Sequence, residues 1–148
     1  MNKLILSGNI LLNENNEIFL LFRKKHSHLE TPSGKLEESE CEDIFNPTKD
    51  ELKEAAKREL FEELEGVLEI ISIDYFDSVD FIIPDGRMAV AHKFITRIKG
   101  NPKASERDLF DKDKSKFFKL EELKNEPISP DLALLLPKLK KHFTKVYK

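Results

Sequence analysis

The sequence contains very little cysteine, no tryptophan and no long hydrophobic run. Its single cysteine, Cys41, cannot form an intrachain disulfide, which fits a protein of a reducing, intracellular compartment. No segment approaches the roughly 18 apolar residues of a membrane span, and the apolar start of the chain turns polar at Ser7-Gly8, too early for a signal peptide. We therefore expect a cytoplasmic protein with no membrane partner.

An excess of one charge is also absent. Twenty-five basic and 28 acidic residues nearly cancel, to a net charge of -3, which argues against a nucleic-acid partner bound by bulk electrostatics. A small basic pocket for phosphate groups needs only a few side chains and is not excluded. The length of 148 residues, of which 39% are apolar, fits a single domain spanning residues 1–148.

Local patterns predict strands and helices along the whole chain. Thr48, followed three residues later by Glu51, is a capping box that predicts the start of a helix. Ser129-Pro130 predicts a second helix start, with a serine cap and a proline in the first turn. The predicted helices cover residues 49–65 and 129–143, with a helical turn at 121–124. The second helix carries an apolar stripe of Leu132, Leu135, Leu136 and Leu139. The predicted strands cover residues 4–12, 18–22, 67–81 (as one or two strands), 88–98 and 116–120.

Turn-forming residues separate these elements. Asn13-Glu14-Asn15-Asn16 predicts a hairpin turn, Thr31-Pro32-Ser33-Gly34 predicts a tight turn, and Pro84-Asp85-Gly86-Arg87 predicts a further turn. Gly100-Asn101-Pro102 is expected to end a strand, and residues 38–47 are expected to form an exposed acidic loop. Strands that flank one early helix, with a second long helix at the end, predict an α/β fold with a mixed sheet between helices.

Three carboxylates share one face of the first predicted helix. Glu59, Glu62 and Glu63 stand at positions i, i+3 and i+4, and like charges at this spacing repel by roughly 0.2–0.5 kcal/mol per pair. The face is either a solvated acidic surface or a site for a divalent cation, which prefers such hard oxygen ligands. The same side of the helix carries three apolar residues, Leu52, Ala55 and Ala56. This half-buried position favours the cation, because buried carboxylates without a partner are costly.

The segment Arg58-Glu59-Leu60-Phe61-Glu62-Glu63 resembles the centre of the Nudix hydrolase box. That box reads Gly, five residues, Glu, seven residues, Arg-Glu, an aliphatic residue, any residue, Glu-Glu, any residue, Gly and an aliphatic residue. Upstream, residues 29–37 look like the approach to the box in MutT-like members, and residues 116–123 resemble a late strand-to-helix segment of the fold. The resemblance implies a Nudix-like α/β/α sandwich with a mixed β-sheet between helices.

The chain departs from the pattern of the family in four respects. Twenty-three residues separate Gly34 from Arg58, ten more than in the box, and we interpret residues 38–47 as an insertion, which loops tolerate. The first Glu of the box then falls on Asp50 or on neighbouring Glu51. Glu65 occupies the position of the later box Gly, and Ser33 replaces a Gly that usually precedes the first one.

The resemblance also implies roles for individual residues. The metal would be Mg²⁺, with Mn²⁺ as an alternative, held by the side chains of Glu59, Glu62 and Glu63 and the backbone carbonyl of Ser33. Arg58 would hold Glu59 in place, and Gly34 would permit a tight turn before the helix. Lys35 and Arg23 would contact substrate, although solvated charges are the alternative for both. The general base would be an acid of a later loop: Glu106 is preferred over Asp108, Asp111 and Asp113.

The function implied is hydrolysis of the pyrophosphate linkage in a nucleoside diphosphate derivative, by attack of water at phosphorus. The substrate would be a nucleoside triphosphate or an ADP-ribose-like compound, and the protein would be a monomer or homodimer. One alternative is a Nudix-fold module that binds nucleotides without hydrolysing them, and another is an unrelated acidic interaction domain. The Arg-Glu and Glu-Glu pairs favour the enzyme, because a binding module need not keep four charges on one helix.

Overall fold

A mixed β-sheet with one long helix on each face forms the fold of this protein. The computed structural model describes residues 3–105 and 109–146. The elements, in chain order, are β1 (Leu4–Leu12), β2 (Ile18–Arg23), β3 (His28–Glu30), β4 (Ser33–Lys35), the 3₁₀ turn η1 (Glu38–Glu40), α1 (Lys49–Glu63), β5 (Leu64–Ile82), β6 (Met88–Ala104), β7 (Phe110–Phe118), the 3₁₀ turn η2 (Leu120–Asn125) and α2 (Pro130–Val146).

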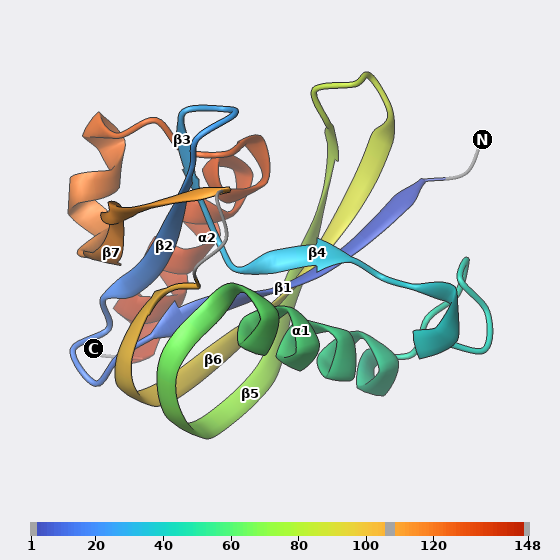
Figure 1. Cartoon of the computed structure of the whole chain (residues 1–148), viewed down its shortest axis with the longest axis horizontal. Helices are drawn as coiled ribbons and strands as arrows, with labels where there is room; N and C mark the ends of the chain where they lie inside the picture. Colours follow the sequence, from blue (N-terminus) through green and yellow to red (C-terminus); the bar gives the residue numbers. More distant parts are fainter. Residues whose placement is uncertain (1–2, 106–108, 147–148) are drawn as a thin grey trace.

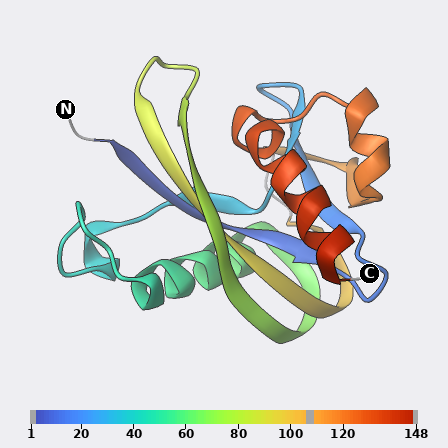
Figure 2. The ribbon, with the colours of Figure 1, turned by 180° about the vertical axis from the view of Figure 1, so that it is seen from behind.

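The strand order in the sheet is β3-β2-β1-β6-β5, with β4 paired to β1 and β7 paired to β2. β1 and β6 run parallel, and the other pairs are antiparallel. Helix α1 lies on the front face of the sheet in Figure 1, and α2 lies on the opposite face, towards the viewer in Figure 2. The predicted α/β/α sandwich with a mixed sheet is confirmed.

Alternation of side chains along β1 and β2 divides the core between the two helices. Leu11 and Phe19 pack in the cluster that contains Leu60 of α1. Their neighbours Ile10, Leu12, Ile18 and Leu20 point to the other face and pack with α2. The α2 stripe predicted from the sequence is buried: Leu132, Leu135, Leu136 and Leu139. Two apolar faces on one sheet explain why the fold needs a helix on each side.

The predicted capping box of α1 is confirmed. The Thr48 hydroxyl accepts a hydrogen bond from the Glu51 amide, and the Glu51 carboxylate accepts one from the Thr48 amide. The predicted end of the helix at Glu65 is wrong, because α1 stops at Glu63. The next residue, Leu64, pairs with Ala104 of β6, so strand β5 begins two residues before Gly66.

Two predictions based on glycine and proline are wrong for the same reason. Residues 33–35 are not part of a tight turn but form β4, because Ser33 pairs with Gly8 of β1. Strand β6 does not stop at Gly100 but continues to Ala104, paired with a bulged part of β5. Gly66 lies in that bulge at φ 83°, and a Cβ there would collide with the Asn101 carbonyl. Long-range pairing overrides the local turn signals in both places.

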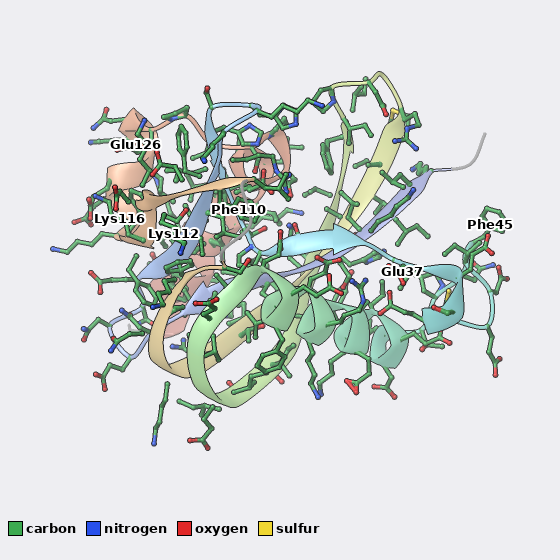
Figure 3. The ribbon with its side chains drawn as sticks, viewed as in Figure 1. Glu37, Phe45, Phe110, Lys112, Lys116 and Glu126 are labelled. Atoms are coloured by element: carbon green, nitrogen blue, oxygen red, sulfur yellow. The ribbon has the colours of Figure 1, made fainter. Side chains whose placement is uncertain are left out.

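The hairpin turn at residues 84–87 and the loop at 38–47 agree with prediction in most respects. The Ile83 carbonyl accepts a hydrogen bond from the Gly86 amide, which closes the β5–β6 turn. The inserted loop carries Phe45 far from the β7 side of the molecule, where Lys116 and Glu126 project (Figure 3). The loop is not wholly exposed, however, because it begins with η1, whose Glu40 side chain is only 16% exposed.

No helix within residues 3–105 and 109–146 has the length and apolar character needed to cross a membrane.

Candidate active site

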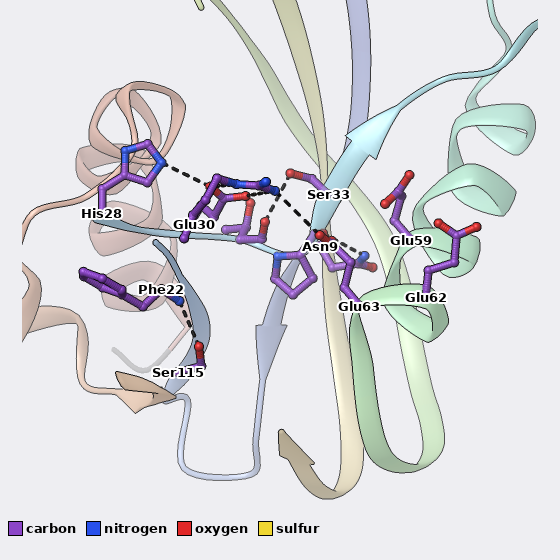
Figure 4. Close-up of polar contacts among 12 residues, drawn as sticks. Asn9, Phe22, His28, Glu30, Ser33, Glu59, Glu62, Glu63 and Ser115 are labelled. Carbon is purple, nitrogen blue, oxygen red and sulfur yellow. Dashed lines mark hydrogen bonds and ion pairs between the residues drawn. The ribbon is translucent and has the colours of Figure 1, made fainter. Parts of the chain in front are cut away.

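Two carboxylates of the predicted metal site are buried at the end of α1. Glu59 is 8% exposed and Glu63 is 3% exposed, and both side chains lie on the side of the helix that faces Ser33 (Figure 4). Glu62 is exposed instead, with its carboxylate 3.2 Å from the Arg58 Nη1 atom. The three acids therefore share a face of the helix, as predicted, but lie at different depths.

Gly34 brings β4 into direct contact with this face. A Cβ at Gly34 would overlap the carboxylate of Glu59, so only glycine allows the strand and the acid to approach this closely. The expectation that Gly34 permits a tight turn is wrong, because residue 34 lies within a strand and its φ is not positive. Its function in the structure is to leave space for Glu59.

Arg58 connects the carboxylates to the loop that precedes the helix. Its guanidinium donates hydrogen bonds to Glu59 (2.7 Å), Glu62 (3.2 Å) and the backbone carbonyl of Lys35 (3.1 Å). The expected contact between Arg58 and Glu59 is confirmed. The Lys35 side chain is exposed, so this residue contributes its carbonyl to the arrangement, and a contact of its ammonium with substrate stays a prediction.

The strongest partner of Arg58 is Glu40, which the sequence analysis did not single out. The carboxylate accepts two hydrogen bonds of 2.7 Å from the guanidinium, a bidentate geometry that is strong and directional. Asp50 is exposed, and Glu51 is occupied by the helix cap. Glu40 also follows Gly34 with five residues between them, which is the spacing of the Nudix box. The first box Glu is thus Glu40, and the extra residues follow it.

Burial makes the two inner carboxylates hard to ionise. Burial, with added repulsion from Glu59 and Glu30, raises the pKa of Glu63 well above its ordinary value, although Arg23 opposes this. Burial also raises the pKa of Glu59, against the effect of Arg58. The Oε1 atom of Glu63 is buried without a hydrogen-bond partner. A cation that neutralised this pair would relieve both costs.

A second charged group, on β2 and β3, borders the carboxylates. Arg23 makes a bidentate contact with Glu30 (2.8 and 2.9 Å), and its guanidinium lies 5.0 Å from the centre of the Phe110 ring. The same guanidinium is 3.9 Å from a carboxylate oxygen of Glu63. Glu30 also contacts the His28 ring at 3.1 Å. Burial tends to raise the pKa of Glu30, but hydrogen bonds from His28 and Arg23 outweigh it and leave that pKa lowered.

Glu30 is a site residue that the sequence analysis missed. The only signal in the sequence was its place in the segment before Gly34. Its importance depends on the pairing of Arg23 with His28 across β2 and β3, which brings residue 30 alongside the arginine. Such a contact between two short strands has no local signature in the sequence.

A pocket of about 390 Å³ opens beside these residues, within the range of small-molecule sites. One wall carries charged and imidazole groups, including Arg23, His28 and Glu30. The opposite wall is apolar and includes Leu4, Leu6 and Phe81. Ser33 and Gly34 line it as well, so the pocket adjoins the strand that contacts Glu59. The arrangement can hold a molecule with one anionic part near the arginine and one flat or apolar part against the other wall.

The remaining predicted site residues have different outcomes. Ser33 lies on β4 close to Glu63, and the ligand role of its backbone carbonyl stays a prediction. Glu106, the preferred general base, lies outside the described residues, as does Asp108. Within residues 3–105 and 109–146, no three His, Cys, Asp or Glu side chains are gathered as a ready metal-binding group. The carboxylates of Glu59 and Glu62 both form ion pairs with Arg58, at 2.7 and 3.2 Å.

Comparison with known proteins gives the family. The profile of the NUDIX domain matches residues 6–139, and the chain therefore belongs to the NUDIX domain family. The unrelated acidic interaction domain is thereby excluded. No curated protein sequence matches the chain.

Solved structures of Nudix proteins share the fold over nearly the whole chain. The MutT protein from Methanosarcina mazei Go1 has a TM-score of 0.69 at 20% identity, covering 96% of this chain and 97% of that one. The NUDIX domain of Shewanella oneidensis NrtR, complexed with ADP ribose, has a TM-score of 0.71 at 14% identity, with coverages of 97% and 90%. A C. elegans Ap4A hydrolase has a TM-score of 0.66 at 15% identity, with coverages of 96% and 98%.

Proposed function

We propose that this protein is a pyrophosphohydrolase that requires a divalent metal and cleaves the phosphoanhydride bond of a nucleoside diphosphate derivative. One observation carries the proposal: Glu59 and Glu63 are buried side by side with raised pKa values, and one oxygen of Glu63 has no partner. A fold does not require such a pair, whereas a cation site does.

The residues present fit a hard cation such as Mg²⁺ or Mn²⁺, because the available donors are oxygens. Glu59, Glu62, Glu63 and the Ser33 carbonyl would hold it. When bound, the cation would polarise a phosphoryl oxygen and lower the pKa of a water ligand. Arg58 keeps Glu59 oriented, and Arg23 is placed at the pocket wall where a phosphate would enter.

In the reaction, the oxygen of water forms a bond to phosphorus and the bond from phosphorus to the bridging oxygen breaks. A nucleoside monophosphate leaves with a phosphorylated second part, or with pyrophosphate when the substrate is a triphosphate. The proton of the attacking water goes to a general base, for which Glu106 remains our proposal. A Glu106→Gln variant should lower kcat at neutral pH and remove the acidic limb of the pH profile, with Asp111→Asn as the matched control.

The relatives named above point to nucleotides of different kinds. The Shewanella domain was solved with ADP ribose, and the C. elegans protein is an Ap4A hydrolase. Their common element is a nucleoside joined to a chain of phosphates. We therefore propose this class as substrate, with the phosphates near Arg23 and the nucleoside against the apolar wall of the pocket.

The test is a panel of nucleoside triphosphates, ADP-ribose and dinucleoside polyphosphates, incubated with Mg²⁺ or Mn²⁺ and analysed by chromatography. Turnover should disappear on chelation and in Glu59→Gln, Glu62→Gln and Glu63→Gln. Glu54→Gln, on the exposed side of α1, is the matched control and should retain full activity. Nucleotide binding without turnover would support the binding-module alternative. Absence of both binding and turnover would contradict the enzyme and the binding module alike.

A further inference from the structure

A lysine is completely buried in the central sheet, behind the carboxylate site. Lys93 on β6 is 0% exposed. Its ammonium has three oxygen neighbours: Asp131 Oδ2 at 2.9 Å, Thr31 Oγ1 at 2.6 Å and Ser33 Oγ at 3.3 Å. An ammonium has three N–H donors, so each donor has one acceptor. Two acceptors belong to the segment that forms β4, and the third belongs to the first turn of α2.

Gly8 makes this reach across the sheet possible. In β1, Gly8 lies opposite Lys93 on one side and opposite Ser33 on the other. Residues opposite each other on neighbouring strands point to the same face, so these three form one row. A Cβ on Gly8 would overlap the Cβ of Ser33. Because Gly8 has no side chain, the side chain of Lys93 can pass over β1 and reach the hydroxyl of Ser33.

Strand β4 is therefore held from both faces. Gly34 contacts the carboxylate of Glu59 on the α1 side, and Ser33, one residue earlier, points the other way towards Lys93. The strand has only three residues, and in the described part of the chain its backbone ladder is with β1. So short an element depends on side-chain contacts for its position.

Burial of the ion pair carries a cost in free energy. Two charges lose their hydration when they are buried, and an apolar pair of similar volume often packs as well or better. Burial tends to raise the pKa of Asp131, but the Lys93 charge together with hydrogen bonds from Ser129, Lys93 and the Leu132 amide outweighs it, and that pKa is lowered. The pair lies beside the pocket, which Ser33 and Asp131 also line.

We propose that the Lys93–Asp131 pair is a positioning device, which holds β4 from the α2 side so that Ser33 and Gly34 stay against Glu59 and Glu63. The proposal rests on the proposed function in that these carboxylates are taken to bind the metal. Through Asp131, the first turn of α2 is tied to the same strand. The pocket wall and the carboxylate site are thus held as one unit.

The test separates positioning from stability. The double variant Lys93→Met/Asp131→Leu replaces the ion pair with an apolar pair and is expected to unfold in urea near the wild-type midpoint. It should nevertheless bind Mn²⁺ alone roughly tenfold more weakly, measured by electron paramagnetic resonance, as when groups that orient metal ligands are lost. Hydrogen exchange of the backbone amides in residues 31–36 should also be faster. Lys138→Met, which removes an exposed pair with Asp77, is the control and should change neither measurement.

A second variant covers the case in which the double variant does not fold. Thr31→Val keeps the ion pair and the shape of the side chain but removes the shortest contact of Lys93. It should shift Mn²⁺ affinity and amide exchange in the same direction, by a smaller factor. Wild-type affinity and wild-type exchange in either folded variant would overturn the proposal. If wild-type protein itself bound no Mn²⁺, the proposed function would fail, and the exchange measurement would still decide whether Lys93 positions β4.

Discussion

The guanidinium of Arg58 donates two hydrogen bonds of 2.7 Å to the carboxylate of Glu40, which lies 18 residues earlier in the chain. This contact fixes the beginning of the inserted loop to the helix that carries the carboxylates. The same guanidinium holds Glu59, so Glu40 acts on the site through one intermediate residue. The insertion lengthens the connection between η1 and α1 and leaves this contact in place.

Loss of the Glu40 contact should impair the site more than the fold. In Glu40→Gln the arginine loses its bidentate partner, and we expect a stability loss of about 1 kcal/mol, because the pair is partly exposed. We expect kcat/KM to fall about tenfold as Glu59 loses its fixed orientation. Urea unfolding and steady-state kinetics measure the two effects. Glu38→Gln, in the same 3₁₀ turn, is the control, and equal kinetic effects in both variants would contradict the prediction.

The stability of the metal-free protein should fall as the pH rises. In the unfolded chain Glu63 ionises near 4.5, whereas burial raises its pKa well above that value in the folded protein. The folded state therefore holds the proton more tightly, and the stabilisation is present below pH 4.5 and lost as the pH passes the raised pKa. In EDTA at pH 8, Glu63→Gln should be more stable than wild type by roughly 1–3 kcal/mol.

Mn²⁺ should reverse this order. The cation requires the ionised carboxylate, so its stabilising effect on the wild type should grow from pH 5 to pH 8 and should be absent in Glu63→Gln. Thermal unfolding at a series of pH values, with and without Mn²⁺, gives both results. A wild-type stability that rises with pH in EDTA, in parallel with the variant, would show that Glu63 is not a strained acid.

Gly34→Ala should remove metal binding at little cost in stability. The three atoms nearest to the added Cβ all belong to the flexible carboxylate end of Glu59, so we expect the carboxylate to move and the fold to lose less than about 1 kcal/mol. Mn²⁺ affinity should fall as far as in Glu59→Gln. In a double-mutant cycle, Gly34→Ala should have no further effect once Glu59 is replaced. Additive losses would mean that the alanine disturbs something other than Glu59.

The Arg23–Glu30 pair offers a test of the second charged group. Arg23→Met leaves the mostly buried Glu30 carboxylate with fewer donors, and we expect a destabilisation of about 2–3 kcal/mol. Arg23→Met/Glu30→Met should recover most of this stability but not the activity, because the guanidinium proposed to contact the phosphates would be absent. Denaturant unfolding and kcat/KM separate the two outcomes. Recovery of activity together with stability would show that Arg23 has a structural role alone.

Elements with strong local signals could be predicted from the sequence. The Thr48–Glu51 cap and the leucine stripe of α2 are produced by neighbouring residues, and both were found where expected. Strand β4 and the continuation of β6 past Gly100 were not predictable, because both exist through pairing with distant strands. Glycine and proline gave the correct local tendency in those segments, but tertiary pairing overcame it.

The candidate site also has one part that could be predicted from the sequence and another that could not. The spacing of Glu59, Glu62 and Glu63 follows from helix geometry, and the sequence alone identified this face. The spacing between Gly34 and Glu40 is also present in the sequence, but it identifies Glu40 as the first box Glu only when the insertion lies after that residue and not before it. Glu30 had no comparable signal.

The sequence by itself determined that this chain carries an acidic helix face preceded by a glycine-containing segment, since both features depend on residues close together in the chain. Only the tertiary structure decided that Glu59 and Glu63 are buried while Glu62 is exposed. It also brought Glu40 to Arg58 and Lys93 to Ser33. The burial of a side chain and the identity of its hydrogen-bond partners depend on how distant strands pack against the helix, and no local pattern of residues contains that information.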